Sequence, residues 1–313
     1  QNAADASMEK GIALAYLTAF VSGISVFANS FGVLTLDPLA YAFVRNILVA
    51  SIIFSLALAW GSWREITSLN KKQLLMLLFI GLVGGGLAFA LFFTGLSQIS
   101  GAYGSFIYRL LFVFAAIIGI SAFKEKPSLH LGAGVALVIA GNFVLLGSES
   151  ITMSFGALLV LAATVLWAAE YAVSKKALES LSLTTVVSAR MGIGSLLLLV
   201  FLLAQGKAES IYSIGYESFG WIVLSVGLLT LFTTLWYSAL KYASLSSATA
   251  TLTLGGPISA LLGAAFAGKS LALWQAGGLL LLATGAVFAV GFGQTVSAAR
   301  WAGRKIGRLL RLS

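Results

Sequence analysis

The chain is divided into apolar runs of about twenty residues, separated by short polar or turn-forming stretches. A helix of that length crosses the roughly 30 Å hydrocarbon core of a bilayer. Only 9% of the residues are charged, against about 25% in soluble domains, so a water-facing surface is excluded. We therefore expect an all-α integral membrane protein with ten transmembrane helices. The predicted spans are Gly11–Val33, Pro38–Trp60, Leu74–Leu96, Gly101–Ser121, Leu131–Gly147, Phe155–Ser174, Leu183–Gln205, Phe219–Leu240, Ser246–Ala267 and Leu271–Phe292.

The second half of the chain repeats the first after a shift of about 144 residues. Phe92–Leu96 then falls on Trp236–Leu240, and Gly141 falls on Gly285. Because each half holds an odd number of spans, the second half enters the membrane inverted, and we expect two inverted five-helix repeats around a central cavity. Inverted repeats are typical of alternating-access transporters, and a passive channel is the other function that this architecture allows. The predicted units are the repeats 11–147 and 155–292 and a basic tail, 293–313.

Basic residues gather on one side of the predicted membrane. Fourteen lie in the segments on the same side as the termini and two, Lys207 and Lys269, on the opposite side. The positive-inside rule therefore predicts a multi-pass protein of the cell inner (cytoplasmic) membrane with both termini in the cytoplasm. This bias also explains the pI of about 9.8 without nucleic acid as a partner.

The tail carries Arg300, Arg304, Arg308 and Arg311 beside Trp301. This pattern fits a short amphipathic helix on an anionic inner leaflet. It fits equally a solvated basic tail that only fixes the topology.

Four ionisable residues fall inside predicted spans, where a charge is costly and is a functional candidate by default: Arg45, Arg109, Glu170 and Arg190. Arg45 and Arg190 are repeat mates near opposite membrane faces, and we expect structural roles for them, snorkelling or binding helix carbonyls, with gating as the alternative. Arg109 has Thr253 as its repeat mate and lies near mid-depth. Its guanidinium would grip a substrate carboxylate or phosphate, or else pair with Glu170.

Glu170 has three candidate roles, which are binding a substrate amine, exchanging a proton, and neutralising Arg109 or Arg190. The four charges sum to plus two, which favours a substrate with an anionic group. Aromatic side chains on several helices suit an amphipathic small molecule. The predicted substrate-binding residues are Arg109, Trp167, Glu170, Tyr171, Tyr103, Trp236, Tyr237 and Phe93.

Two small-residue clusters interrupt predicted spans. Gly84, Gly85 and Gly86 fall in the third span, and Gly255, Gly256 and Pro257 fall in the ninth. Missing side chains and a missing N–H weaken a helix, so we expect these six residues to act as gates or hinges.

Catalytic and metal chemistry have no support in the sequence. The chain has no Cys and one His, and no nucleotide-binding loop or nucleophile with a neighbouring base is present. We expect no enzymatic activity, no cofactor and no metal site.

The residues resemble the drug/metabolite transporter superfamily, in its ten-helix branch with two EamA-type repeats. The resemblance is carried by Leu166–Lys175, Leu235–Tyr242, Phe123–Pro127, Gly134–Gly141 and Gly256–Ile258, with Arg45 and Arg190. Two departures stand out: Lys269 occupies the position that mirrors Glu125, where the family usually has an acidic residue, and Gly23 occupies the position that mirrors Trp167.

The resemblance implies export or exchange of small metabolites, and the chain is similar to the family's exporters of aromatic and hydrophobic amino acids. We therefore expect a secondary transporter of such amino acids, with sugar-phosphate or nucleotide-linked substrates as the alternative. The expected partners are the small-molecule substrate and the lipid bilayer. A homodimer and a monomer fit the sequence equally.

Overall fold

The computed structural model describes residues 2–32, 36–212, 215, 218–268 and 270–309. Lys269 and Arg311 thus lie outside the described residues. In the described part, ten helices are long and apolar enough to cross a membrane, which confirms the predicted fold class. The elements are α1 (Asn2–Gly32), α2 (Pro38–Ala59), α3 (Arg64–Thr67), α4 (Lys71–Phe79), the π-helix η1 (Ile80–Leu87), α5 (Ala88–Leu96), α6 (Gly101–Arg109), α7 (Leu111–Phe123), α8 (Leu129–Leu146), α9 (Phe155–Ala177), α10 (Leu183–Ala204), α11 (Glu209–Tyr212), α12 (Phe219–Tyr242), α13 (Leu245–Leu252), α14 (Gly255–Phe266), α15 (Leu273–Val290) and α16 (Phe292–Leu309).

Polar caps fix where most of the spans begin. The Asp37 carboxylate accepts hydrogen bonds from the backbone N–H groups of Leu39 and Ala40, at 2.9 and 3.1 Å, and Pro38 follows at the first helical position. Such caps satisfy N–H groups that the helix itself leaves unpaired. Side chains cap the starts of further helices in the same way at Asn70, Ser100, Ser128, Ser154, Ser182 and Ser244.

The interior of three spans differs from the sequence prediction. The third span is continuous through η1, where the expected glycine interruption is a stretch of π-helix. The fourth, predicted as one uninterrupted helix, is split at Leu110 between α6 and α7. The ninth is split at Thr253 and Leu254 between α13 and α14, so Gly255, Gly256 and Pro257 form the first turn of α14.

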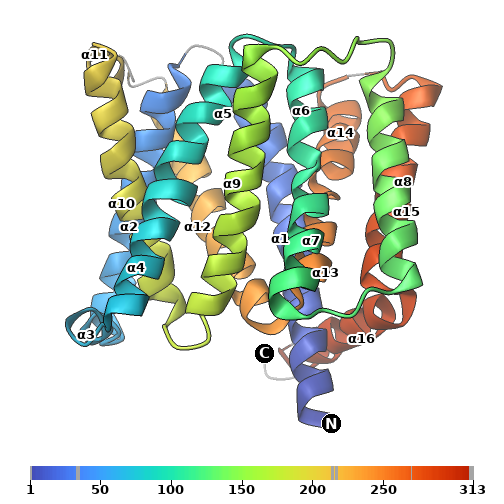
Figure 1. Ribbon diagram of the computed structural model, residues 1–313, viewed down its shortest axis with the longest axis horizontal. Helices are drawn as coiled ribbons and strands as arrows, with labels where there is room; N and C mark the ends of the chain where they lie inside the picture. Colours follow the sequence, from blue (N-terminus) through green and yellow to red (C-terminus); the bar gives the residue numbers. More distant parts are fainter. Residues whose placement is uncertain (1, 33–35, 213–214, 216–217, 269, 310–313) are drawn as a thin grey trace.

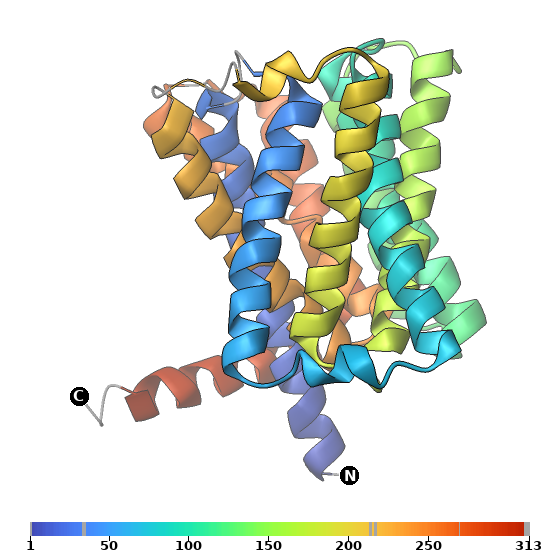
Figure 2. The ribbon, with the colours of Figure 1, turned by 90° about the vertical axis from the view of Figure 1, so that its left-hand side faces the viewer.

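The helices form two inverted five-helix repeats around a central cavity. In Figure 1, α8 and α15 stand at one edge of the bundle and α2 and α10 at the other, with α1, α9 and α12 and the two split spans between them. α1 starts at the end of the bundle where both termini lie, and α9, the first span of the second repeat, starts at the opposite end. Figure 2 shows both termini at one end, as an even number of spans requires.

α8 and α15 pack closely against each other at one edge of the bundle. A Cβ at Gly141 would lie 2.7 Å from the carbonyl oxygen of Gly278, so neither position has room for a side chain. Small residues at such crossings let two helix backbones approach closely.

Candidate functional site

The two split spans meet in the middle of the bundle, and their breaks are repeat mates. Leu110 and Leu254 are 144 residues apart, and at each break the N–H bonds to the carbonyl three residues back, at 3.0 Å. The outer halves α6 and α14 lie toward the end opposite the termini, and α7 and α13 lie toward the terminal end (Figure 1). Arg109, the last residue of α6, and its repeat mate Thr253 both line the cavity between these breaks.

A cavity of about 180 Å³ lies between these breaks, α1 and α12. Its lining near the terminal end is closed, with Phe112 and Thr249 each 1% exposed. Toward the opposite end the lining is more exposed, with Tyr108 38% and Val26 55% exposed. The lining residues are Ser22, Val26, Ser105, Tyr108, Arg109, Leu111, Phe112, Phe232, Thr249, Leu252, Thr253, Gly255 and Gly256.

Arg109 is the charged residue of this lining, and a neutral amide holds it. Its Nη1 donates to Oδ1 of Asn142 on α8 at 3.0 Å, and the Asn142 Nδ2 donates to the carbonyl of Phe106 at 2.8 Å, in the last turn of α6. The guanidinium reaches toward α14, because a Cβ at Gly256 would lie 3.6 Å from its Nη2. Within the described part of the chain, no carboxylate forms an ion pair with Arg109.

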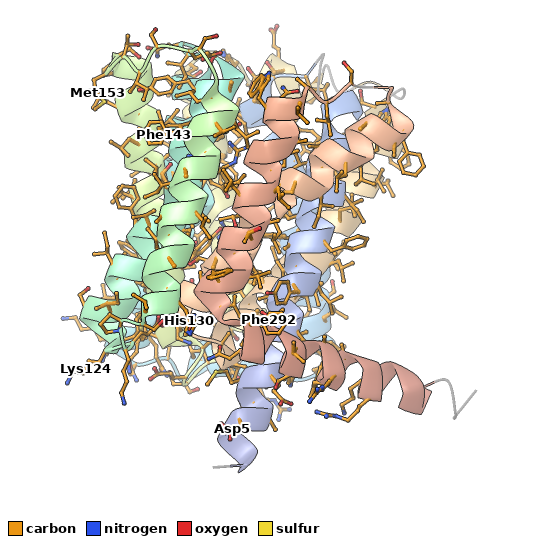
Figure 3. The ribbon with its side chains drawn as sticks, turned by 90° about the vertical axis from the view of Figure 1, so that its right-hand side faces the viewer. Asp5, Lys124, His130, Phe143, Met153 and Phe292 are labelled. Carbon is orange, nitrogen blue, oxygen red and sulfur yellow. The ribbon has the colours of Figure 1, made fainter. Side chains whose placement is uncertain are left out.

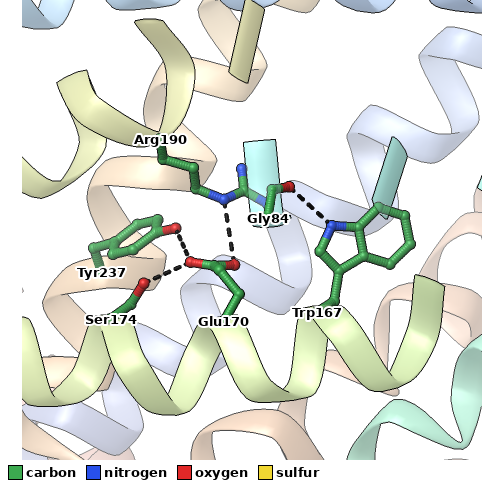
Figure 4. Close-up of polar contacts among 6 residues, drawn as sticks. All are labelled: Gly84, Trp167, Glu170, Ser174, Arg190 and Tyr237. Carbon is green, nitrogen blue, oxygen red and sulfur yellow. Dashed lines mark hydrogen bonds and ion pairs between the residues drawn. The ribbon is translucent and has the colours of Figure 1, made fainter. Parts of the chain in front are cut away.

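Glu170 lies outside this lining, in a buried polar cluster with Arg190 (Figure 4). It is 0% exposed and accepts hydrogen bonds from the hydroxyls of Ser174 and Tyr237, the latter at 2.9 Å. Its other oxygen lies 3.4 Å from Nε of Arg190. Of the two partners that the sequence offered, Glu170 thus pairs with Arg190 and not with Arg109.

Snorkelling, one of the two structural roles expected for Arg190, does not describe its position here, because the side chain is buried in an ion pair with Glu170. Arg190 is 6% exposed, and its guanidinium lies beside Glu170 of α9 and 5.8 Å from the centre of the Phe89 ring on α5, so the Glu170 charge replaces water as its partner. Arg45 behaves differently: it is half-buried, and its guanidinium lies 5.4 Å from the centre of the Tyr41 ring, a cation–π contact. The two repeat mates thus have different surroundings.

Gly84 and Gly85 of η1 make room for this cluster, and Gly86 makes room for α10 beside it. A Cβ at Gly84 would lie 2.2 Å from Cγ of Glu170, and one at Gly85 would lie 2.0 Å from the carbonyl oxygen of Arg190. At Gly86 it would meet Leu197. The Gly84 carbonyl accepts a hydrogen bond from Nε1 of Trp167 at 3.0 Å (Figure 4). The role of Gly84, Gly85 and Gly86 as hinges stays a prediction, but the packing requires that these three residues have no side chain.

Predicted aromatic residues lie one layer behind the cavity wall. The Trp167 ring meets the lining residue Tyr108 edge to face, at 5.6 Å between ring centres. Trp236, which is 1% exposed, stacks behind the lining residue Phe232 at 6.5 Å and contacts Tyr171 at 4.8 Å. These three predicted residues support the wall and do not line the cavity.

The other predicted aromatics lie outside the lining as well. Tyr103 donates its hydroxyl to the carbonyl of Thr152 at 3.1 Å and packs on Phe106. Phe93 stacks on Phe89, and Tyr237 belongs to the Glu170 cluster. Of the predicted substrate-binding residues, the described cavity lining contains Arg109.

Sequence reasoning missed two charged residues, Glu125 and Lys175, that bind the turn between α12 and α13 at the terminal end of the bundle; we call this arrangement the clasp. The Glu125 carboxylate accepts from the backbone N–H groups of Leu245 and Ser246, at 2.6 and 3.2 Å, at the start of α13. Lys175 donates to the carbonyls of Leu240 and Ala243, at the end of α12. Each charge meets the helix end of opposite polarity. The signal for Glu125 was its mirror position, Lys269; Asn142, also missed, is a neutral polar residue in a span and carried no charge signal.

Comparison with known proteins places the chain in a family. The profile of the EamA-like transporter family matches residues 9–147 and 154–291. The chain belongs to this family. It is a multi-pass membrane transporter of the drug/metabolite transporter superfamily, as its sequence resemblance implied.

The similar proteins do not indicate which substrate is transported. An uncharacterized transporter of Archaeoglobus fulgidus is 26% identical over 234 residues, 71% of this chain and 78% of that protein. One of Methanothermobacter thermautotrophicus is 26% identical over 206 residues, 64% of this chain and 58% of that protein. A solved crystal structure superposes with a TM-score of 0.72 at 16% identity, over 88% of this chain and 95% of that one, which shows the fold alone.

Proposed function

We propose that this EamA-like transporter moves a small amphipathic metabolite with a carboxylate group, with hydrophobic and aromatic amino acids as the first class to test. The observation that carries the proposal is the unequal treatment of two arginines. Arg190 is neutralised by Glu170, whereas Arg109 is held at the cavity by the neutral amide of Asn142. The Arg109 charge therefore stays available to an anionic ligand, which a guanidinium binds through two parallel hydrogen bonds.

The rest of the lining suits the uncharged part of such a ligand. Phe112, Phe232 and Leu252 offer apolar surface, and Ser22 and Ser105 add hydroxyl groups from α1 and α6. The volume of about 180 Å³ is below the roughly 300–1,000 Å³ of clefts for drug-sized ligands. A nucleotide-linked sugar would need a larger cavity and further cations, so the described lining favours a small monoanion.

We infer that the buried lining at the terminal end and the exposed lining at the other end correspond to one of the two states that alternating access requires. We infer that exchange between the inverted repeats opens the terminal end in the other state. A coupled proton is not needed for this cycle, so facilitated export or exchange is the proposed mode.

Counterflow into proteoliposomes tests the proposal. Vesicles loaded with unlabelled amino acids are given labelled phenylalanine, threonine or a nucleotide sugar, with Arg109→Ala and Arg109→Lys beside the wild type. Arg45→Gln is the matched control, since it removes a charge within the bundle but outside the cavity. We expect amino-acid accumulation that Arg109→Ala abolishes, Arg109→Lys weakens and Arg45→Gln retains.

Each contrary result has a separate meaning. Exchange of the nucleotide sugar alone would refute the substrate class, and normal transport by Arg109→Ala would refute the site. Non-saturable flux without trans-stimulation would identify a channel.

A further inference from the structure

The C-terminal helix α16 runs across the end of the bundle and does not continue its direction. α15 ends at Val290, and Gly291 follows with φ of +94°, a conformation that favours glycine and turns the chain. Figures 2 and 3 both show α16 lying crosswise to the spans and extending past the outline of the bundle. Because it starts where a span ends, α16 lies at the depth of the lipid headgroups.

Specific contacts fix α16 in this position. The hydroxyls of Tyr16 on α1 and Thr295 on α16 lie 2.9 Å apart, and Ala298 is 1% exposed. Nη2 of Arg304 lies 3.1 Å from Oε2 of Glu9. These contacts attach the helix to α1, and a solvated tail without fixed structure does not fit them.

The charges of α16 are all positive and lie along one face. Phe292–Leu309 contains Arg300, Arg304, Lys305 and Arg308 and no acidic residue. At 100° per residue, Arg300, Arg304 and Lys305 fall within one half of the helix circumference, together with Trp301, which packs on the protein core, and the other half carries Phe292, Val296 and Ala299. Phe292 is 74% exposed, so part of this apolar half is uncovered by protein.

Part of the positive charge on the basic face is not neutralised by the acidic residues that the structure describes. Arg300 and Lys305 are exposed, and within the described part of the chain neither forms an ion pair. The Arg304 side chain is 60% exposed even with Glu9 beside it. An uncovered apolar stripe next to unmatched cations, at headgroup depth, is the arrangement of an interfacial helix on an anionic leaflet.

We propose that α16 binds the phosphate headgroups of anionic phospholipids in the leaflet next to the chain termini. Arg300 and Lys305 supply the charge that protein contacts leave unmatched, and the apolar face of α16 enters the acyl boundary. The proposal is independent of the transported substrate. It makes α16 a lipid-dependent attachment of α1, whose residues Ser22 and Val26 line the cavity.

The test uses the full-length protein and the double variant Arg300→Gln/Lys305→Gln, which leaves the Arg304–Glu9 contact in place. Lys71→Gln/Lys72→Gln is the matched control, because it removes two exposed charges at the same end of the bundle. Binding of phosphatidylglycerol and of phosphatidylcholine is measured by native mass spectrometry and by titration in detergent, after thermal unfolding has shown that each variant is folded.

We expect the wild type and the lysine control to prefer phosphatidylglycerol, and the α16 variant to bind it roughly 30-fold more weakly, with a smaller salt dependence. Unchanged phosphatidylglycerol binding in the α16 variant would overturn the proposal. Inorganic phosphate in parallel separates the two sources of the anion: if phosphate alone competes at the concentration of the lipid, α16 holds a free anion and not a membrane surface.

Discussion

The interior of the third span has no room for a side chain at Gly84. A Cβ there would lie 2.2 Å from Cγ and 2.7 Å from Oε2 of Glu170, so Gly84→Ala forces the buried cluster to shift. We expect a loss of about 1–3 kcal/mol in the free energy of unfolding, the usual cost of overpacking, measured by unfolding in detergent micelles. Gly227→Ala is the control, since open space surrounds that position on α12 and alanine favours a helix. Equal stability of the two variants would contradict the packing described for η1.

Asp37 makes part of the stability depend on pH. Burial raises the pKa of its carboxyl, but the backbone N–H groups of Ala40 and Leu39 and the Lys207 ammonium outweigh it and hold that pKa below its usual value. A carboxyl with a lowered pKa stabilises the fold above its unfolded pKa of about 3.9, and this contribution is lost as the pH falls through the folded value.

Asp37→Asn isolates that contribution, because asparagine keeps the helix cap and removes the charge. We expect the variant to be less stable at pH 7 by under about 1 kcal/mol, since the Lys207 side chain is 49% exposed. The difference should shrink as the pH falls below about 3.9 and disappear once the folded carboxyl is protonated too. Thermal unfolding of both proteins from pH 7 to pH 3 measures it, and parallel curves would show that the charge has no such role.

At this scale the sequence identified the charges but not their partners. Arg109 and Glu170 stood out because an ionisable residue in a span needs a reason. Whether Glu170 faced Arg109 or Arg190 depended on the rotation of α9 and α10 about their axes, which the uniformly apolar spans leave undetermined. Asn142 was missed because a neutral amide gives a weaker signal than a charge, although it determines where Arg109 points.

Among the elements, the spans themselves were the easiest to predict, and their breaks were harder. The split of the ninth span agrees with Gly255, Gly256 and Pro257, which lie directly after it. The split of the fourth falls at Leu110, where no glycine or proline marks it. The break in the fourth span could have been predicted only from the break in the ninth, because Leu110 and Leu254 are equivalent positions in the two repeats.

The clasp at the α12–α13 turn predicts a local change when Glu125 is removed. Glu125→Ala deprives the Leu245 and Ser246 N–H groups of a charged acceptor. A hydrogen bond to a charged group contributes about 1.5–3 kcal/mol, so we expect these two amides to exchange with deuterium at least roughly tenfold faster. Hydrogen exchange read by mass spectrometry checks this.

Glu179→Ala is the control for the clasp, because Glu179 pairs with Lys176 at an exposed site and such pairs contribute little. Its exchange at the α12–α13 turn should match the wild type. If Glu125→Ala left the turn equally protected, the carboxylate would not stabilise the start of α13.

For the whole molecule, the duplication was visible in the sequence, but the unequal use of its halves was not. Arg109 and Thr253 are mates and both line the cavity, yet one is a cation and the other a hydroxyl. Glu125 is a clasp in the first repeat, and its mate in the sequence is Lys269. Which end of the cavity is open belongs to one conformation of the bundle, so residue patterns alone do not determine it.

Both the orientation in the membrane and the open end of the cavity can be checked with single cysteines, because the chain contains none. Val26→Cys is placed at the open part of the cavity, where Val26 is 55% exposed, and Thr249→Cys at its closed floor, where Thr249 is 1% exposed. Lys126→Cys marks the loop between α7 and α8 at the terminal end.

In intact cells, a membrane-impermeant maleimide should modify Val26→Cys and leave the other two unmodified. After permeabilisation, Lys126→Cys should react as well, because the positive-inside rule predicts that this end lies in the cytoplasm. Reaction of Lys126→Cys in intact cells would reverse the proposed orientation, and a reactive Thr249→Cys with an unreactive Val26→Cys would mean that the protein rests with the terminal end open.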